Sequence, residues 1–110
     1  MIFALGDDFV KVADTKDIQP SQMKEVELNG EKICVANAEG KYYAIGNVCT
    51  HLGGPLAQGK LEGYEVQCPW HGSRFDIRTG RVARPPAIRP EPTYEIKVEN
   101  DNILLKNRSK

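Results

Sequence analysis

Turn signals interrupt this sequence about every eight to twelve residues, and no other feature restricts its fold as strongly. Asn29-Gly30 lies between two runs of alternating apolar and polar residues, which predicts a two-residue hairpin with a type I′ turn. Glu39-Gly40 joins ICVAN to KYYAI in a second hairpin. Short strands that reverse this often are typical of sandwiches and barrels, so the sequence predicts an all-β fold with an antiparallel framework.

Further strands are expected on both sides of these hairpins. FVKVAD (9–14) alternates and should begin a continuous antiparallel meander, and Thr15 should cap the short turn that follows this strand. YEVQC (64–68) and RFDIRTGRVA (74–83) are expected to be shorter strands. The last hairpin should be YEIKVENDNILLK, with Asn100-Asp101-Asn102 as its turn.

The segment 46–86 differs in composition from the rest of the chain, because it contains seven of the ten glycines. Such a density indicates loops that need positive φ or a close approach of the backbone to another group. RPPAIRPEP (84–92) contains four of the seven prolines and cannot be a central strand. The sequence therefore predicts one domain (1–110), with a framework at 1–45 and 87–110 and an inserted subdomain at about 46–86.

Composition excludes several classes of protein. Lys plus Arg (15) equals Asp plus Glu (15), so no general attraction to nucleic acid or to a membrane surface is expected. No apolar run approaches the length of a membrane span, and MIFAL is too short for the core of a signal peptide. Three cysteines are an odd number for a disulfide scaffold, so a cytoplasmic protein with reduced thiols is expected. Of the chain, only the NRSK tail is expected to be disordered.

Charge is distributed unevenly along the chain. Residues 49–90 contain six Lys or Arg and three acids, whereas residues 1–48 contain five Lys and eight acids. The arginines of the basic region are either scattered solvated side chains or a docking face for an acidic partner, and both readings stay open. They are Arg74, Arg78, Arg81, Arg84 and Arg89.

Two short stretches in the glycine-rich segment combine a cysteine with a histidine. CTHLGG contains Cys49 and His51, CPWHGS contains Cys68 and His71, and the chain has no other histidine. Four such side chains in two close pairs indicate a metal site. Zinc sites commonly group Cys with Cys and His with His. Here each loop mixes the two types, which suits a centre of two metal atoms, although a zinc-stabilised module remains an alternative.

CTHLGG and CPWHGSRFD resemble the two cluster-binding loops of the Rieske iron–sulfur family, and the similarity extends from about residue 9 to residue 105. The chain is most similar to the soluble Rieske-type ferredoxins that serve aromatic-ring dioxygenases. The resemblance implies the Rieske fold and one [2Fe–2S] cluster. It also implies that Cys49 and Cys68 hold the buried iron and that His51 and His71 hold the outer iron.

The chain departs from the respiratory Rieske proteins at three positions. Those proteins have an extra cysteine in each loop, and here Gly54 and Trp70 stand instead, so no bridge can join the loops. Phe75 replaces a tyrosine whose hydroxyl donates towards a cluster-ligating sulfur, while Ser73 keeps a hydroxyl that can reach the sulfides. Fewer donors lower the midpoint potential, so it should lie in the lower half of the roughly −150 to +300 mV that Rieske centres span.

The remaining residues singled out are expected to surround the cluster. Three glycines let N–H groups approach the sulfides, or are ordinary turn glycines: Gly53, Gly54 and Gly72. Pro85 and Pro86 resemble the family's proline loop, which screens the cluster from water. Trp70 should pack beside the exposed histidine or line the docking surface, where Leu52 and Pro55 would add an apolar rim. Cys34 is interpreted as a buried strand residue and not as a reactive thiol.

The resemblance implies a one-electron carrier. It would receive electrons from a reductase that contains flavin or an iron–sulfur cluster and pass them to a terminal oxygenase. It would not be a catalyst, because iron-based oxygenation needs two further histidines and a carboxylate with open positions. A second reading is a small Rieske-like subunit fixed in an enzyme complex, such as a nitrite reductase.

Overall fold

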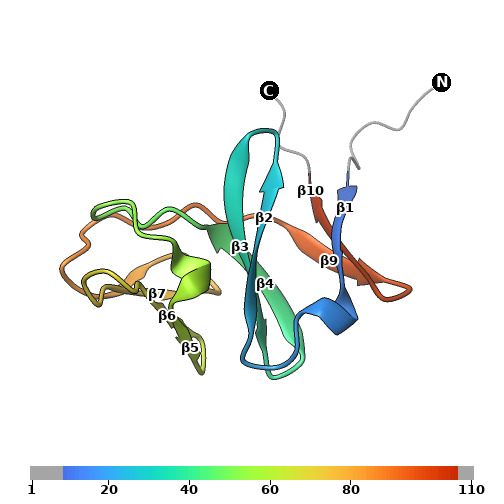
Figure 1. Cartoon of the computed structure of the whole chain (residues 1–110), viewed down its shortest axis with the longest axis horizontal. Helices are drawn as coiled ribbons and strands as arrows, with labels where there is room; N and C mark the ends of the chain where they lie inside the picture. The colour runs from blue at the N-terminus through green and yellow to red at the C-terminus, as the bar shows by residue number, and fades with distance from the viewer. Residues whose placement is uncertain (1–8, 107–110) are drawn as a thin grey trace.

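The structure is a computed structural model that describes residues 9–106, so the expectations for MIFAL and for NRSK lie outside the described residues. Within that range, ten strands form three antiparallel sheets (Figure 1). The helical segments between residues 9 and 106 are two turns of three residues, η1 (Thr15–Asp17) and η2 (Leu56–Gln58), and neither approaches the length of a membrane span. The expected antiparallel all-β fold is confirmed.

The first sheet joins the two ends of the described chain. Its strand order is β1 (Phe9–Asp14), β10 (Asn102–Lys106) and β9 (Ile96–Glu99). Phe9 lies opposite Lys106, so β1 pairs with the last strand and not with the strand that follows it. The expectation of a continuous meander from residue 9 was therefore wrong, because local alternation does not say which distant strand is the partner.

The second sheet contains the two predicted hairpins. Its order is β2 (Met23–Leu28), β3 (Glu31–Ala38) and β4 (Lys41–Gly46). Asn29 and Gly30 have φ of 54° and 78°, which gives the two left-handed residues of a type I′ turn. Two central residues with positive φ also form the turns of the two other predicted hairpins, Glu39-Gly40 and Asn100-Asp101. Asn102, expected in the last turn, is instead the first residue of β10.

The third sheet lies in the glycine-rich part of the chain, at the left of Figure 1. Its strands are β5 (Lys60–Glu62), β6 (Glu65–Gln67), β7 (Arg74–Asp76) and β8 (Val82–Arg84), in that order. The sequence did not predict β5, and the other three strands are shorter than expected. No strand is described between Arg84 and Ile96, as the prolines predict. The boundaries of a separate subdomain at 46–86 stay a prediction.

Strand β3 is buried on both faces and separates two cores. Ile33 and Val35 pack with strands of the first sheet, including Ile103 of β10. The intervening Cys34 and Ala36 face the other way, towards the third sheet and its loops. This period of two residues places the framework on one side of the central sheet and the Cys/His loops on the other. Burial raises the pKa of the Cys34 thiol to about 12, so it is a core residue, as expected.

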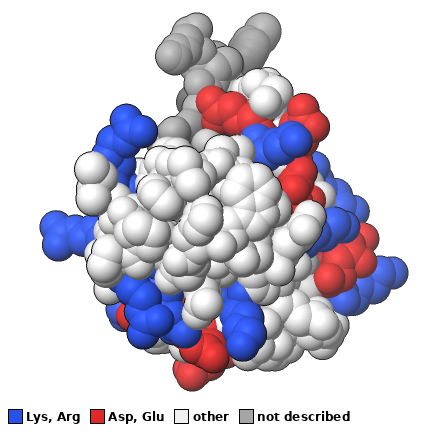
Figure 2. All heavy atoms as spheres, turned by 60° about the vertical axis from the view of Figure 1, so that its left-hand side comes forward, with Lys and Arg blue, Asp and Glu red and all other residues white. Residues whose placement is uncertain are grey.

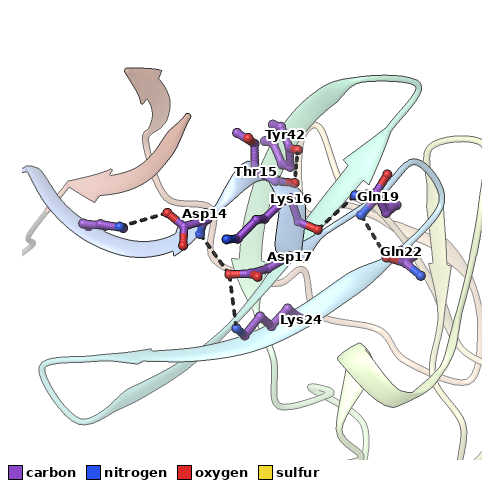
Figure 3. A network of polar contacts seen from close by, with 9 residues as sticks. Asp14, Thr15, Lys16, Asp17, Gln19, Gln22, Lys24 and Tyr42 are labelled. Atoms are coloured by element: carbon purple, nitrogen blue, oxygen red, sulfur yellow. Dashed lines mark hydrogen bonds and ion pairs between the residues drawn. The ribbon is translucent and has the colours of Figure 1, made fainter. Parts of the chain in front are cut away.

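The turn η1 connects the first two sheets through a polar network (Figure 3). The hydroxyl of Tyr42 lies 3.1 Å from the carbonyl oxygens of both Thr15 and Ile18. The Asp17 carboxylate accepts the N–H of Asp14 at 3.1 Å. Asp14, rather than Thr15, is therefore the residue that precedes the turn, because the acidic side chain three residues on reaches back to it.

Candidate metal centre

The loop that carries Cys49 follows β4 and is closed by its own backbone. The N–H of Cys49 donates to the carbonyl oxygen of Gly54 at 2.8 Å, and the N–H of Gly53 donates to the carbonyl oxygen of Cys49 at 2.8 Å. Gly53 has φ of 86°, a value that favours glycine. The cysteine therefore sits at the base of a tight loop whose tip carries His51.

The loop that carries Cys68 lies between β6 and β7 and repeats this hydrogen-bond pattern. The N–H of Cys68 donates to the carbonyl oxygen of Ser73 at 2.7 Å, and the N–H of Gly72 donates to the carbonyl oxygen of Cys68 at 3.2 Å. Gly72 has φ of 81° at the position equivalent to Gly53. The two loops thus share one hydrogen-bond pattern, and each carries a histidine, two residues after Cys49 and three residues after Cys68.

The two cysteines lie in the same part of the site, and the two histidines lie next to each other. Cys49 and Cys68 are 3% and 2% exposed and belong to one core cluster. The rings of His51 and His71 lie 5.3 Å apart between centroids and are nearly perpendicular, and both are partly or fully exposed. The site therefore has a buried sulfur end and an accessible imidazole end.

Burial raises the pKa of the Cys49 thiol, and the neighbouring Cys68 raises it further. Hydrogen bonds from the backbone N–H groups of His51 and Leu52 lower this pKa and offset part of the rise. A raised pKa means that the free thiol holds its proton at neutral pH. Metal binding must displace that proton, so occupation of the site is coupled to deprotonation.

The arrangement of the two cysteines and two histidines indicates which kind of metal centre they can hold. Among residues 9–106, no three His, Cys, Asp or Glu side chains are close enough together to hold a single ion. A zinc site of two cysteines and two histidines needs all four donors around one ion. A Rieske cluster needs two thiolates on one iron and two imidazoles on the other. A pair of buried thiols and a pair of accessible imidazoles fit the two-iron cluster and disfavour the zinc alternative.

Gly54 and Trp70, which stand where respiratory Rieske proteins have the two cysteines of a disulfide, lie close together in the structure. A Cβ at position 54 would stand 3.1 Å from the ring of Trp70 and 2.7 Å from Cys68 Sγ. The indole ring thus fills the space between the two loops that a cysteine pair would occupy. Trp70 is also 56% exposed, so one part of the ring packs and another faces solvent, in keeping with both roles considered for it.

The side chains beneath the second loop are buried and differ in polarity. Phe75 is fully buried in the same core cluster as the two cysteines and carries no donor. The Ser73 hydroxyl, also fully buried, accepts the N–H of Ala87 at 3.0 Å and so keeps its own proton to donate. Pro86, next to Ala87, is exposed. Its role as a screen over the cluster stays a prediction.

The arginines of the basic region do not act as one group. Arg74 is paired with Glu62 at 2.7 Å, and Arg78 is paired with Asp76 at 2.9 Å. Arg81, Arg84 and Arg89 are exposed. Two of the five arginines are therefore committed within the chain.

Figure 2 shows the end of the molecule that lies at the left of Figure 1. The centre of this face is uncharged, and Lys and Arg with a few acids gather at its margin. The exposed large apolar side chains of the Cys/His loops and the proline segment are Val48, Leu52, Trp70 and Ile88. Ile88, which is 88% exposed, lies between Ala87, bonded to Ser73 of the second loop, and Arg89, bonded to Thr50 of the first loop. The apolar rim of Leu52 and Pro55 stays a prediction.

Sequence reasoning missed one buried acid near the site. Glu91 is 4% exposed, and its carboxylate accepts the N–H of Thr50 at 2.9 Å. Burial raises the pKa of Glu91 to about 7, against the hydrogen bond from Thr50. No sequence signal marks this residue, because a glutamate among prolines is normally a solvated loop residue.

The fold and the paired donors define an iron–sulfur protein of the Rieske type. Residues 8–95 match the Rieske [2Fe-2S] domain, so the chain belongs to that family, whose domain holds a [2Fe–2S] cluster. The chain is 36% identical over 99 residues to the ferredoxin component of the naphthalene 1,2-dioxygenase/salicylate 5-hydroxylase systems of a Ralstonia species. That match covers 90% of this chain and 95% of the relative.

Solved structures agree with the sequence relatives. The ferredoxin of carbazole 1,9a-dioxygenase from Nocardioides aromaticivorans IC177 superposes with a TM-score of 0.87 at 29% identity, over 91% of this chain and 98% of that one. A chain from the complex of reduced oxygenase and oxidized ferredoxin in carbazole 1,9a-dioxygenase also gives 0.87, at 28% identity, over 94% and 97% of the two chains. The Rieske fold expected from the sequence is thereby confirmed.

Proposed function

We propose that this chain is the ferredoxin component of an oxygenase system and carries one electron at a time from a reductase to a terminal oxygenase. The observation that supports this most is the segregation of the donors, with buried thiols at one end of the site and accessible imidazoles at the other. The match to a relative named as a ferredoxin component adds support, since it covers 95% of that relative at 36% identity.

Four side chains are proposed to hold the cluster. Cys49 and Cys68 would ligate the inner iron, and His51 and His71 would ligate the outer iron. The cluster, when bound, supplies a one-electron redox change. The cysteines keep their end of the site dry, because both lie in the core. The imidazoles place their rings at the surface, where a partner's cofactor can approach closely.

The face around the histidines is suited to transient docking. Its centre is uncharged and its margin carries basic residues (Figure 2), which is the arrangement of an apolar contact inside a polar rim. The ferredoxin of carbazole 1,9a-dioxygenase is known in a complex with its oxygenase. By analogy, this face would meet a terminal oxygenase and, in turn, a reductase that contains flavin or an iron–sulfur cluster. A carrier of this kind is an electron-transfer component and not a catalyst.

A cytoplasmic location is part of the proposal. Cys34, Cys49 and Cys68 are all free and buried. Thiols that must remain reduced to bind iron are suited to a reducing compartment.

The first experiment measures the cluster itself. Protein purified without oxygen should contain iron and acid-labile sulfide in equal amounts and give a Rieske-type electron paramagnetic resonance spectrum after reduction with dithionite. A colourless protein that contains zinc would overturn the proposal. Co-purification with one fixed large partner would instead support the reading as a subunit of a complex.

The second experiment measures transfer through the proposed face. Electron flow from a dioxygenase-system reductase through this chain to its oxygenase should be followed with Ile88→Asp and with Val98→Asp as the matched control. Val98 is an exposed apolar residue of the framework sheet, 45% exposed. Ile88→Asp should slow transfer by about tenfold, since it places a charge in an apolar contact, and Val98→Asp should leave the rate unchanged. Equal effects of the two substitutions would remove this face from the proposal.

A further inference from the structure

Two hydrogen bonds from the segment after β8 hold Thr50, the residue between Cys49 and His51. The carboxylate of Glu91 accepts the N–H of Thr50 at 2.9 Å. The hydroxyl of Thr50 donates to the carbonyl oxygen of Arg89 at 2.6 Å. Both the backbone and the side chain of the residue between the two proposed ligands are therefore fixed from one direction.

Glu91 is itself held from two further sides. Its N–H donates to the carbonyl oxygen of Gly80 at 2.8 Å, which anchors it to the turn between β7 and β8. Its other carboxylate oxygen lies over Gly46 at the end of β4, where a Cβ would stand only 2.7 Å away. The carboxylate thus has little freedom to move, and it connects the end of β4, the β7–β8 turn and the first loop.

The hydrogen bond between Glu91 and Thr50 lies between the two proposed ligands of the first loop. Cys49 precedes Thr50 and His51 follows it, so a rotation of this peptide would redirect both side chains. The backbone of the first loop is closed by bonds between Cys49 and Gly54, between Gly53 and Cys49 and, at its base, between Leu56 and Asn47. None of these backbone bonds involves Thr50 or His51, so the hydrogen bonds to Glu91 and Arg89 support this part of the loop from outside.

We propose that Glu91 is a positioning residue of the metal centre, which holds Thr50 and thereby fixes the direction in which the first loop presents Cys49 and His51. This inference rests on the proposed cluster site, but it goes beyond the ligand set. Glu91 is not proposed to touch the cluster. It acts through the loop.

The test compares Glu91→Leu, which removes the acceptor, with Glu91→Gln, whose amide oxygen can still accept the N–H of Thr50. Glu99→Leu on β9 is the control for loss of an exposed glutamate. Iron release to a chelator and the g-values of the reduced protein are measured for each. Glu91→Leu should release iron faster by about 10- to 100-fold, the usual range for losing such a supporting contact, and should shift the g-values. Glu91→Gln and Glu99→Leu should stay near wild type.

Thr50→Ala provides a second test if Glu91→Leu does not accumulate as a folded protein. It keeps the carboxylate contact and removes only the bond to Arg89. Release should be accelerated to a smaller extent, by a few fold to about tenfold, with a g-value shift in the same direction. Wild-type release and g-values in Glu91→Leu would overturn the inference, and where Glu91→Leu cannot be obtained the same result in Glu91→Asp, whose shorter side chain withdraws the acceptor from the N–H of Thr50, would overturn it. A wild-type protein without a cluster would overturn the proposed function instead, so the two failures are distinguishable.

Discussion

The most direct consequence of the site geometry concerns the substitution Gly54→Ala. The new Cβ would stand 2.7 Å from Cys68 Sγ and 3.1 Å from the Trp70 ring, both closer than ordinary van der Waals contact. The second loop must move by several tenths of an ångström, and the sulfur that must move is a proposed iron ligand. Overpacking of this kind costs about 1–3 kcal/mol.

That cost can be followed in two measurements. For a chain of this size, about 1 kcal/mol lowers the apparent Tm by roughly 4 °C, so Gly54→Ala should lower it by about 4–12 °C. Iron content per chain should fall as well, because the thiolate is displaced. Gly53→Ala is the control, since its Cβ meets only Val48 at 3.9 Å and its cost of about 1–2 kcal/mol comes from the positive φ alone.

The double substitution Gly54→Ala with Trp70→Ala separates the two contacts. Removing the ring relieves the 3.1 Å contact and leaves the contact with the sulfur, so Gly54→Ala should lower Tm by less in the Trp70→Ala background than in the wild type, while iron content stays low. Full iron content and an unchanged Tm in Gly54→Ala would refute the reasoning. Equal loss of iron in Gly53→Ala would assign the effect to the conformation of the loop and not to the sulfur.

Three further predictions follow from buried side chains. Phe75→Tyr restores a donor, and one hydrogen bond worth about 1–1.5 kcal/mol to the reduced cluster should raise the midpoint potential by about 40–60 mV in a redox titration; an unchanged potential would contradict this. Cys34 should resist iodoacetamide at pH 8 until the protein unfolds, since burial raises its pKa to about 12; labelling of the native protein would disprove it. Glu91 keeps its proton in the folded protein up to about pH 7 but loses it near 4.5 when unfolded, so stability should fall by up to about 3 kcal/mol as pH rises between these values. Thermal unfolding of Glu91→Gln should lack this decline, and an identical decline in the variant would assign it to other groups.

Local sequence signals predicted the hairpins well. Asn29-Gly30 and Glu39-Gly40 adopt the left-handed pairs of residues that their turns require, because a two-residue hairpin depends on only a few neighbouring residues. The pairing of β1 with β10 was not predictable in this way, since the two strands lie at opposite ends of the described chain. The short strand β5 was also missed, because three residues are too few for alternation to stand out.

The amino-acid sequence alone specifies which donor atoms the chain can offer to a metal. Two thiols and two imidazoles in mixed pairs, with Gly54 and Trp70 where a disulfide would need cysteines, are chemical facts that no fold can alter. Which of these donor atoms are buried and which are accessible depends on the tertiary structure. It buries both sulfurs in one core, leaves both imidazoles accessible, and places Glu91 against Thr50 across about forty residues of chain. Burial and long-range contact depend on which distant segments pack together, and that information is not present in any local pattern.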